Sequence, residues 1–275
     1  MPSLTWLYAA AAALLVALGA AGLLKYRAGR KLGPRLAEAA PVLGFLAGFV
    51  ALAQGLPFLN NVPQHPVGEV GVVALSLAIV LAVLPPGPRL GRYLALGAGV
   101  VAVLWQVPGG QVPEAVWLQA GAAALLSWLV LDRLVLLAPS GAAAPLILAM
   151  TALGLGLIGA AAHAGLLGGM ALALAAACAG LLVWLRPWSK AKLGLAVPLG
   201  AGMVLAALGF ATLAGAARTP WALVLLLPAF WAETIMRRVP ALARLGKKKP
   251  QRVLVLAGTA AIPVVAAVAL AFVLP

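Results

Sequence analysis

Lysine and arginine are unevenly distributed among the gaps that separate the long apolar segments of this chain. Of the 19 Lys and Arg residues, 18 lie in alternate gaps, and the gaps between those hold only Arg218. In multi-pass membrane proteins, short loops rich in Lys and Arg stay on the cytoplasmic side, whereas loops without them are translocated. The pattern therefore predicts a multi-pass integral protein of a cell inner membrane and assigns a side to each loop.

The composition excludes several other classes of protein. Hydrophobic residues make up 65% of the 275 residues and charged residues only 9%, whereas roughly a quarter of an ordinary soluble domain is charged. The net charge of +14 lies in short loops, where it serves topology and contact with membrane lipids rather than nucleic-acid binding. The single cysteine, Cys178, lies in an apolar segment, so neither an internal disulfide nor a multi-cysteine metal site is expected.

The predicted fold class is all-α, a polytopic transmembrane helical bundle that forms one integral domain over residues 1–275. Each span needs about 20 apolar residues, and ten segments qualify. Their limits are near 4–24, 40–59, 68–84, 91–107, 114–131, 142–162, 166–185, 193–216, 219–235 and 252–274. Both termini are then extracytoplasmic. The first segment has no Lys or Arg before it, which favours a retained span, with removal as a signal peptide as the alternative.

Tryptophan and glycine positions add to this prediction. Trp side chains prefer the headgroup level, and the eight in this chain are expected at outer span ends (Trp6, Trp105, Trp117, Trp221) or inner ones (Trp128, Trp184, Trp188, Trp231). Gly44 and Gly48, and likewise Gly165 and Gly169, are four residues apart. This spacing lets helices approach closely, and we expect it to serve packing within the chain, with a dimer face as the alternative.

Polar residues are concentrated on the predicted outer side. We interpret them as a vestibule that binds substrate, with ordinary loop residues as the alternative. The vestibule residues are Gln54, Asn60, Asn61, His65, Glu69, Glu114, His163 and Arg218. Arg218 is the only outer cation, and Glu69 and Glu114 are the only outer anions. Arg218 is therefore expected either to pair with one of these carboxylates or to hold an anionic substrate group.

On the predicted inner side, Glu233 precedes Arg237 by four residues, which brings the two side chains together on one helix. We expect a satisfied pair there, and a similar one between Asp132 and Arg133. The basic stretch after residue 236 is expected to hold the topology or to bind a lipid headgroup through Arg237, Arg238, Lys247, Lys248 and Lys249.

No motif for a cofactor, a metal or a catalytic reaction is present. Two histidines are too few for a typical zinc site, and Asp132 is the only aspartate, which argues against Mg²⁺-dependent transfer of lipid-linked groups. Catalytic residues, metals and cofactors are therefore not expected.

Ten spans divide into halves of five, 1–138 and 139–275, which have opposite orientations because five is odd. Carriers often place the substrate site between such inverted halves. The count is similar to that of the ten-span drug and metabolite transporter superfamily, but those carriers keep both termini inside, and the halves of this chain show no residue match.

Three functions remain. The first is a small permease or lipid-translocating carrier. The second is a non-catalytic subunit, scaffold or assembly factor that packs against other membrane protein subunits. The third is a lipid-modifying enzyme that uses His65, Glu69 and Glu114.

Overall fold

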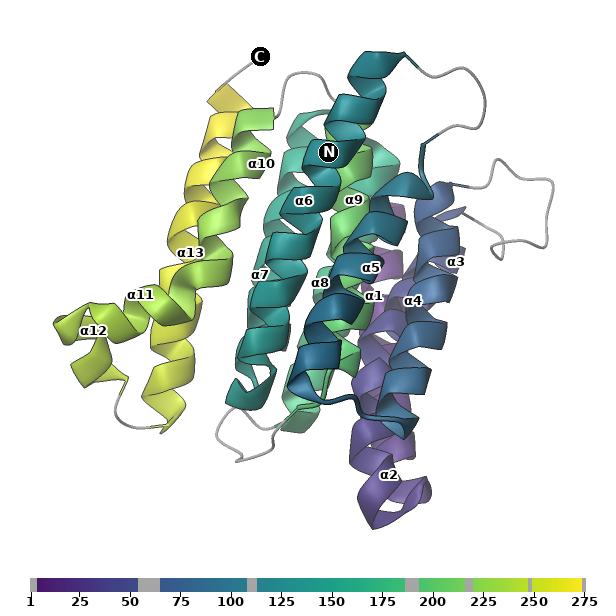
Figure 1. Cartoon of the computed structure of the whole chain (residues 1–275), viewed down its shortest axis with the longest axis vertical. Coiled ribbons are helices and arrows are strands. Elements are labelled where there is room, and N and C mark those ends of the chain that lie inside the picture. The colour runs from purple at the N-terminus through teal and green to yellow at the C-terminus, as the bar shows by residue number, and fades with distance from the viewer. Residues whose placement is uncertain are drawn as a thin grey trace.

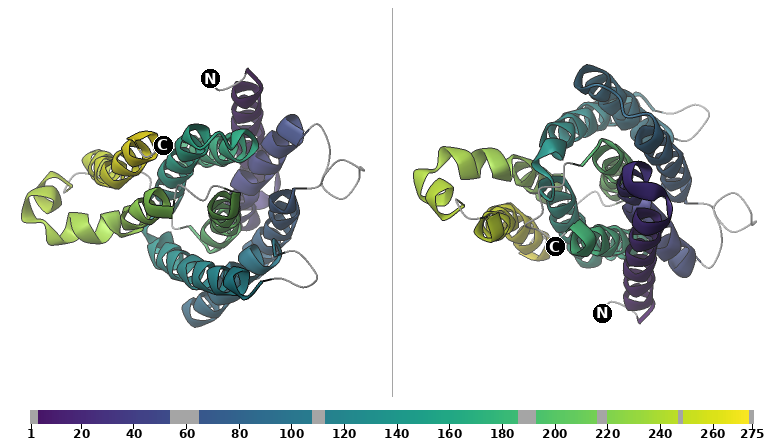
Figure 2. Two further views of the ribbon diagram at one scale, coloured as in Figure 1. Left: turned by 90° about the horizontal axis from the view of Figure 1, so that it is seen from above. Right: turned by 90° about the horizontal axis from the view of Figure 1, so that it is seen from below.

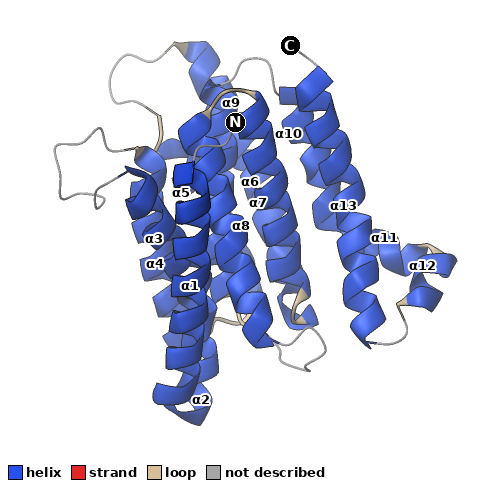
Figure 3. Cartoon of the chain, turned by 180° about the vertical axis from the view of Figure 1, so that it is seen from behind, coloured by secondary structure: helices blue, strands red, loops and turns tan. Residues whose placement is uncertain are grey.

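The computed structural model describes residues 4–53, 65–107, 113–185, 193–215, 220–246 and 249–273. Within these ranges every regular element is a helix (Figure 3). Eta labels mark 3₁₀ turns, except η3, which is a π-helix. The elements are α1 (Leu4–Arg27), α2 (Gly29–Leu36), η1 (Ala37–Ala39), α3 (Ala40–Ala53), α4 (Pro66–Val83), α5 (Pro88–Leu104), α6 (Glu114–Leu137), η2 (Ala138–Ser140), α7 (Ala143–Ala161), α8 (Gly165–Leu185), η3 (Val197–Ala201), α9 (Gly202–Gly215), α10 (Pro220–Leu226), η4 (Leu227–Trp231), α11 (Ala232–Arg238), α12 (Pro240–Leu245) and α13 (Lys249–Val273).

Eight helical segments among the described residues are long and apolar enough to cross a membrane. They are Leu4–Arg27, Leu32–Ala53, Pro66–Val83, Glu114–Ser140, Ala143–Ala161, Gly165–Leu185, Ala196–Gly215 and Gln251–Val273. Each can satisfy its backbone hydrogen bonds internally, which lipid requires. The chain is therefore a multi-pass helical membrane protein, as its composition predicts.

Two of the ten predicted spans are not among these eight segments. The segment predicted at 91–107 forms α5, which has only 17 residues. The segment predicted at 219–235 is divided into α10, the 3₁₀ turn η4 and α11. Pro228 lies in the first turn of η4, where its missing N–H prevents a continuous α-helix.

Helix α6 is longer than predicted. The sequence suggested a span at 114–131, but α6 continues to Leu137 and is followed directly by η2. Trp128 therefore lies about two and a half turns before the end of the helix. Asp132 and Arg133 lie about one turn beyond Trp128 within α6, so the placement of Trp128 at the inner end of its span stays a prediction.

The helices surround a central one. Figure 2 shows α9 inside a ring of helices, and α9 contacts α4, α5, α6, α7 and α8 while η3 contacts α3. In the apolar stretch 196–215, 83% of the residues are buried, against 28% in α1 and in α13. Helices α1 and α13 therefore lie at the periphery, where α1 packs on α3 and α8, and α13 packs on α7 and α10.

The described cations gather at one end of the bundle, which we call the cationic end. It contains α2, the starts of α5 and α13, and the ends of α1 and α6 (Figure 1), and thus Lys25, Arg35, Arg92, Arg133 and Arg252. The first described residue of α1 and the last of α13 lie toward the opposite end (Figure 1).

Small residues join α1, α3 and α8 at close range. Ala9, Ala13 and Ala17 recur every four residues on α1 and are fully buried. A Cβ added to Gly44 would lie 2.5 Å from the carbonyl oxygen of Ala13, and one added to Gly48 would lie 2.6 Å from Cβ of Ala173. The Gly44–Gly48 spacing therefore serves packing within the chain, as predicted.

Of the predicted glycine pair at the start of α8, Gly165 and Gly169, only Gly169 lies in a close helix contact. A Cβ on Gly169 would meet Leu52 at 3.2 Å, whereas one on Gly165 would find only Trp6 at 3.6 Å. The close approach of α7 and α8 depends instead on Gly159 and Gly168, since a Cβ on Gly159 would lie 2.9 Å from Cα of Gly168.

Replacing Gly44 with alanine should destabilise the bundle. The new methyl group would force α1 away from α3, an overpacking effect of about 1–3 kcal/mol. Gly97→Ala on α5 is the matched control, because Gly97 is exposed and a Cβ there meets nothing within 4 Å. Thermal unfolding in detergent should show a lower midpoint for Gly44→Ala and an unchanged or higher one for Gly97→Ala; equal midpoints would contradict the packing described here.

Candidate functional site

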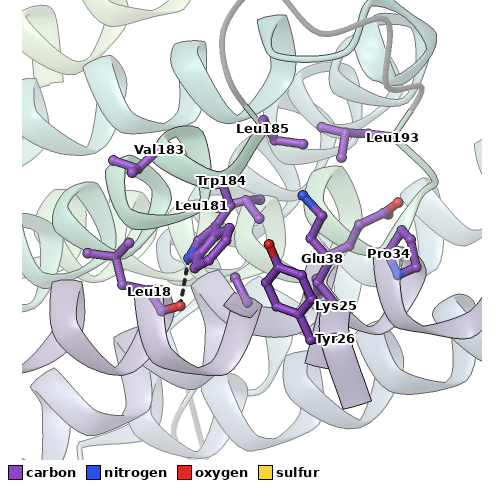
Figure 4. A pocket seen from close by; sticks show the side chains of 12 residues that line it. Leu18, Lys25, Tyr26, Pro34, Glu38, Leu181, Val183, Trp184, Leu185 and Leu193 are labelled. Carbon is purple, nitrogen blue, oxygen red and sulfur yellow. Dashed lines mark hydrogen bonds between the residues drawn. The ribbon is translucent and has the colours of Figure 1, made fainter. Parts of the chain in front are cut away.

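Two hollows among the described residues differ in their chemistry. The first is a cavity of about 480 Å³ at the cationic end, bounded by α1, α2, η1, α8 and Leu193 (Figure 4). Its polar side chains are Lys25, Tyr26 and Glu38, and Trp184 forms an aromatic wall. We call it the Glu38 cavity.

Glu38 is the acidic residue of this cavity, and it is buried. Its residue is only 4% exposed, and it lies in η1, the 3₁₀ turn between α2 and α3. The backbone N–H of Gly194 donates a hydrogen bond to Oε1 of Glu38 at 2.7 Å. Gly194 lies two residues before the helical segment that begins at Ala196 and continues through η3 into α9. Glu38 therefore holds the chain that leads into this segment against the junction of α2 and α3.

The aromatic wall is fixed by its neighbours on α1. Nε1 of Trp184 donates a hydrogen bond to the carbonyl oxygen of Leu18 at 2.8 Å. The Trp184 ring packs edge-on against Tyr26, with ring centroids 5.9 Å apart, and Nζ of Lys25 lies 5.6 Å from its centroid. A Cβ on Gly22 would lie 2.7 Å from the Trp184 ring. The Trp184 ring is thus held in place on several sides, and its indole N–H is not free to bind a ligand because it donates to Leu18.

Sequence reasoning missed the role of Glu38. It lies just after five Lys and Arg residues, at the end of the predicted cationic loop. One signal was available: only five acidic residues occur in the chain, and Glu38 is directly followed by an apolar run. An acidic residue at the start of a span is expensive in lipid unless it faces protein or a cavity.

The second hollow is an apolar groove of about 340 Å³ between α6, α7, α9 and α10. It extends from Gln119 and Pro220 near the opposite end to Val130 and Phe230. From Gln119 to Val130 the helix rises about 16 Å, so the groove runs along the middle of α6. We call it the α6–α10 groove.

The lining of this groove is almost entirely hydrocarbon. Its polar side chains are Gln119, Ser127 and Thr151, and the Thr151 hydroxyl is already donated to the carbonyl oxygens of Ile147 and Leu148. Gly209 on α9 also lines the groove, and a Cβ there would meet nothing within 4 Å. The groove therefore suits an apolar chain better than a polar solute.

Polar contacts tie the helices together just beyond the groove. Arg133 of α6 donates to the carbonyl oxygen of Phe230 and to the hydroxyl of Thr234. These bonds attach α6 to η4 and α11, where the backbone leaves regular α-helix and a carbonyl becomes available.

Glu233 is the centre of a second set of polar contacts. Its Oε1 atom accepts from Arg237 at 2.5 Å, Arg252 at 2.6 Å and Ser140 at 3.2 Å. The predicted Glu233–Arg237 pair is confirmed, but Arg252 of α13 was not foreseen because it lies 19 residues away. Oε2 of Glu233 is buried without a hydrogen-bond partner among the described residues.

The predicted pair between Asp132 and Arg133 was wrong. Asp132 accepts two hydrogen bonds from Arg92 of α5, at 2.6 and 3.2 Å, rather than pairing with Arg133. Adjacent residues on a helix point about 100° apart. Asp132 therefore faces α5, while Arg133 faces η4 and α11.

The predicted outer vestibule is only partly within the described residues. Gln54, Asn60, Asn61 and Arg218 lie outside them, so the proposed pairing of Arg218 with Glu69 or Glu114 stays a prediction. His65, Glu69, Glu114 and His163 all lie toward the opposite end of the bundle (Figure 1).

No hydrogen bond joins the described vestibule residues to one another. Oε2 of Glu69 accepts from Nε1 of Trp105 at 2.7 Å, and Nδ1 of His65 accepts from the N–H of Val67 at 3.4 Å. Glu114 is exposed in the first turn of α6, and His163 is exposed in the α7–α8 turn with a φ of 57°. The acid–base arrangement expected of an enzyme is not formed by these contacts.

The residues predicted to bind a lipid headgroup also lie only partly within the described residues. Arg237 and Arg238 end α11, and Arg237 is bound to Glu233 while remaining 65% exposed. Lys247 and Lys248 lie outside the described residues, and the side chain of Lys249, at the start of α13, does as well. The predicted contact with lipid headgroups stays a prediction.

Comparison with protein-family models and with curated proteins finds no match to this chain. Among the described residues, no group of three or more His, Cys, Asp or Glu side chains is placed to hold a metal ion.

Removing the Glu233 charge should destabilise the contact between α11 and α13. Glu233→Gln leaves Arg237 and Arg252 without their carboxylate, at a cost of about 1–3 kcal/mol because both guanidinium groups are partly solvated. Glu114→Gln is the control, since it makes the same chemical change at an exposed position. Unfolding midpoints in detergent should fall for Glu233→Gln only; an equal or smaller fall than for the control would contradict this assignment.

His65 should make stability depend on pH. Burial lowers the pKa of His65 from its ordinary value of 6.5, and the neutral ring accepts the Val67 N–H at the start of α4. The unfolded chain therefore binds a proton at higher pH than the folded one, so stability is full above about pH 6.5 and declines as the pH falls toward the lowered value. His65→Asn keeps an acceptor for the helix start but cannot titrate. It should flatten the profile of unfolding midpoint against pH between neutral and acid conditions; an unchanged slope would contradict the role of His65.

Proposed function

We propose that this protein is a lipid-translocating carrier of a cell inner membrane. The observation that carries the proposal is the α6–α10 groove, which runs along the middle of α6 and is lined almost wholly by hydrocarbon. With α6 spanning the membrane, the groove lies at mid-depth. A carrier for a hydrophilic solute needs polar partners at this depth, because an unsatisfied polar group in an apolar site is costly. The groove provides few such partners, so an acyl chain is the better occupant.

In this proposal the chain crosses the membrane ten times. The eight long segments are joined by α5 and by the broken helix from Pro220 to Arg238, which passes beside α13 (Figure 1). A 17-residue helix is at the short end of the range that spans a bilayer. Ten crossings support one orientation: the cationic end faces the cytoplasm, and both termini are extracytoplasmic.

The position of the groove also fits two inverted halves. Helix α6 belongs to the half 1–138, and α7, α9 and α10 belong to the half 139–275. Carriers of this plan bind cargo between their halves and alternate access by moving one against the other. The π-helix η3 directly precedes α9, and the 3₁₀ turn η4 interrupts the α10–α11 segment; such departures from regular α-helix often mark hinges.

The alternative is a non-catalytic subunit that packs against other membrane proteins. The wide exposed faces of α1 and α13 support it, since each has only 28% of its apolar stretch buried. Lipid covers such a face equally well, so the groove is the more specific observation.

Filling the groove should inhibit lipid transfer. Gly209→Leu places a side chain in the open space on α9, and we expect the rate of phospholipid flipping in proteoliposomes to fall about tenfold, the effect of about 1.4 kcal/mol. The measurement is quenching of a fluorescent phospholipid from the outside of the vesicle. Gly258→Leu is the matched control, because Gly258 is exposed on α13, has no atom near its Cβ position and does not line the groove.

Two outcomes would count against the proposal. If Gly209→Leu flips phospholipid at the wild-type rate, the groove does not take part in lipid transfer. If phospholipid flips no faster in vesicles with wild-type protein than in protein-free vesicles, the carrier function is wrong. Co-purification of another membrane protein in fixed ratio would then support the non-catalytic subunit.

A further inference from the structure

We propose that the Glu38 cavity binds a primary ammonium joined to a phosphate, with the ammonium at Glu38 and the phosphate at Lys25. This chemistry occurs in the headgroup of an aminophospholipid and in a free aminoalkyl phosphate. The cavity lies on the α1 and α8 side of the bundle, away from the α6–α10 groove, so the inference goes beyond the proposed carrier function and does not depend on it.

Glu38 has no close cationic partner among the described residues. Its carboxylate is removed from water and accepts hydrogen bonds from the backbone N–H groups of Gly194 and Ala196. Arg35 interacts with it electrostatically, but no described Lys or Arg nitrogen lies within 4 Å. A buried charge is costly unless it is paired and hydrogen-bonded. A primary ammonium has three N–H donors, and one that enters the cavity would pair directly with the carboxylate.

Opposite charges are separated across the cavity. Lys25 lies at the exposed rim and Glu38 at the buried floor. The two groups do not form an ion pair with each other, because Nζ of Lys25 lies over the Trp184 ring instead. A ligand with a cation and an anion at its two ends can therefore contact both groups. Lysine is a common partner of phosphate, and the Tyr26 hydroxyl is a further donor in the cavity.

Apolar side chains beside the cavity favour the lipid source. Figure 4 shows Leu18 and Val183 on one side of Trp184, and Lys25 and Glu38 on the other. Leu18 and Val183 belong to α1 and α8, and Val183 is 64% exposed. An acyl chain attached to the phosphate can follow this apolar wall into the bilayer, while the headgroup remains at the level where the cationic end meets water.

The experiment measures lipid binding to the full chain in detergent by native mass spectrometry. The probes are phosphatidylethanolamine, phosphatidylcholine, whose methylated ammonium has no N–H donor, and phosphatidylglycerol, which has no ammonium. Wild-type protein should bind the ethanolamine lipid about tenfold more tightly than the other two, as expected for one charge-assisted hydrogen bond. Free phosphoethanolamine added as a competitor distinguishes the two sources: it should displace the lipid only at much higher concentration, and equal potency would assign the site to the free solute.

Two variants assign the roles of the charged groups. Glu38→Gln keeps an oxygen for the Gly194 N–H and should abolish the preference for ethanolamine while phosphate-dependent binding remains. Lys25→Gln should weaken all three lipids. Arg27→Gln is the matched control for Lys25, because Arg27 is an exposed cation two residues away that does not line the cavity.

The proposal is overturned if wild-type protein binds the three lipids equally, or if Glu38→Gln retains the preference for ethanolamine. It is also overturned if Arg27→Gln weakens binding as much as Lys25→Gln does. Unfolding midpoints measured on the same samples separate loss of binding from loss of fold, and wild-type selectivity among the three lipids tests the cavity even if Glu38→Gln fails to fold. Gly209→Leu should leave this selectivity unchanged, so failure here and failure of the carrier function are distinguishable.

Discussion

The architecture depends on close contact between helix backbones in a solvent that does not drive them together. Lipid is as apolar as the helix surfaces, so association must come from dispersion and from close fit. Helices α1, α3 and α8 meet where Ala13, Gly44 and Ala173 leave no room for an added methyl group. The same principle joins α7 to α8 at Gly159 and Gly168. The ring of helices around α9 is built on these contacts.

Polar contacts add specificity to this apolar assembly, and the strongest of them lie at the cationic end. Arg92 and Asp132 join α5 to α6, and Glu233 joins α11 to α13 through Arg252. Near the headgroups, water and lipid phosphates reduce the cost of burying a charge, and long side chains can reach them. Pairs at this level therefore fix which helices are neighbours, whereas similar pairs at mid-depth would cost more. Arg133 serves the same purpose through the freed carbonyl of Phe230.

The two hollows differ in chemistry because they lie at different levels of the bundle. The α6–α10 groove runs along the middle of α6, and the Thr151 hydroxyl in its lining donates its hydrogen bond to the backbone of α7. The Glu38 cavity is at the end of the bundle, where Lys25 can remain exposed while Glu38 is buried. An apolar chain fits the first environment and a charged headgroup fits the second. Both hollows border the segment that contains α9: the groove is lined by Gly209, and Glu38 binds Gly194 at its start.

The sequence by itself determined the class of fold, because apolar segments of span length and cations in alternate gaps leave a helical membrane bundle as the physical solution. It also predicted the Gly44–Gly48 contact and the Glu233–Arg237 pair, since both depend on spacing along one helix. Only the tertiary structure decided which helix is central, that Asp132 pairs with Arg92, and that α6 and α10 border a groove. These features join residues that are far apart in the chain, and local periodicity carries no information about such contacts. Glu38 is one example. Its carboxylate accepts a hydrogen bond from Gly194, 156 residues later, and no local sequence pattern could indicate that contact.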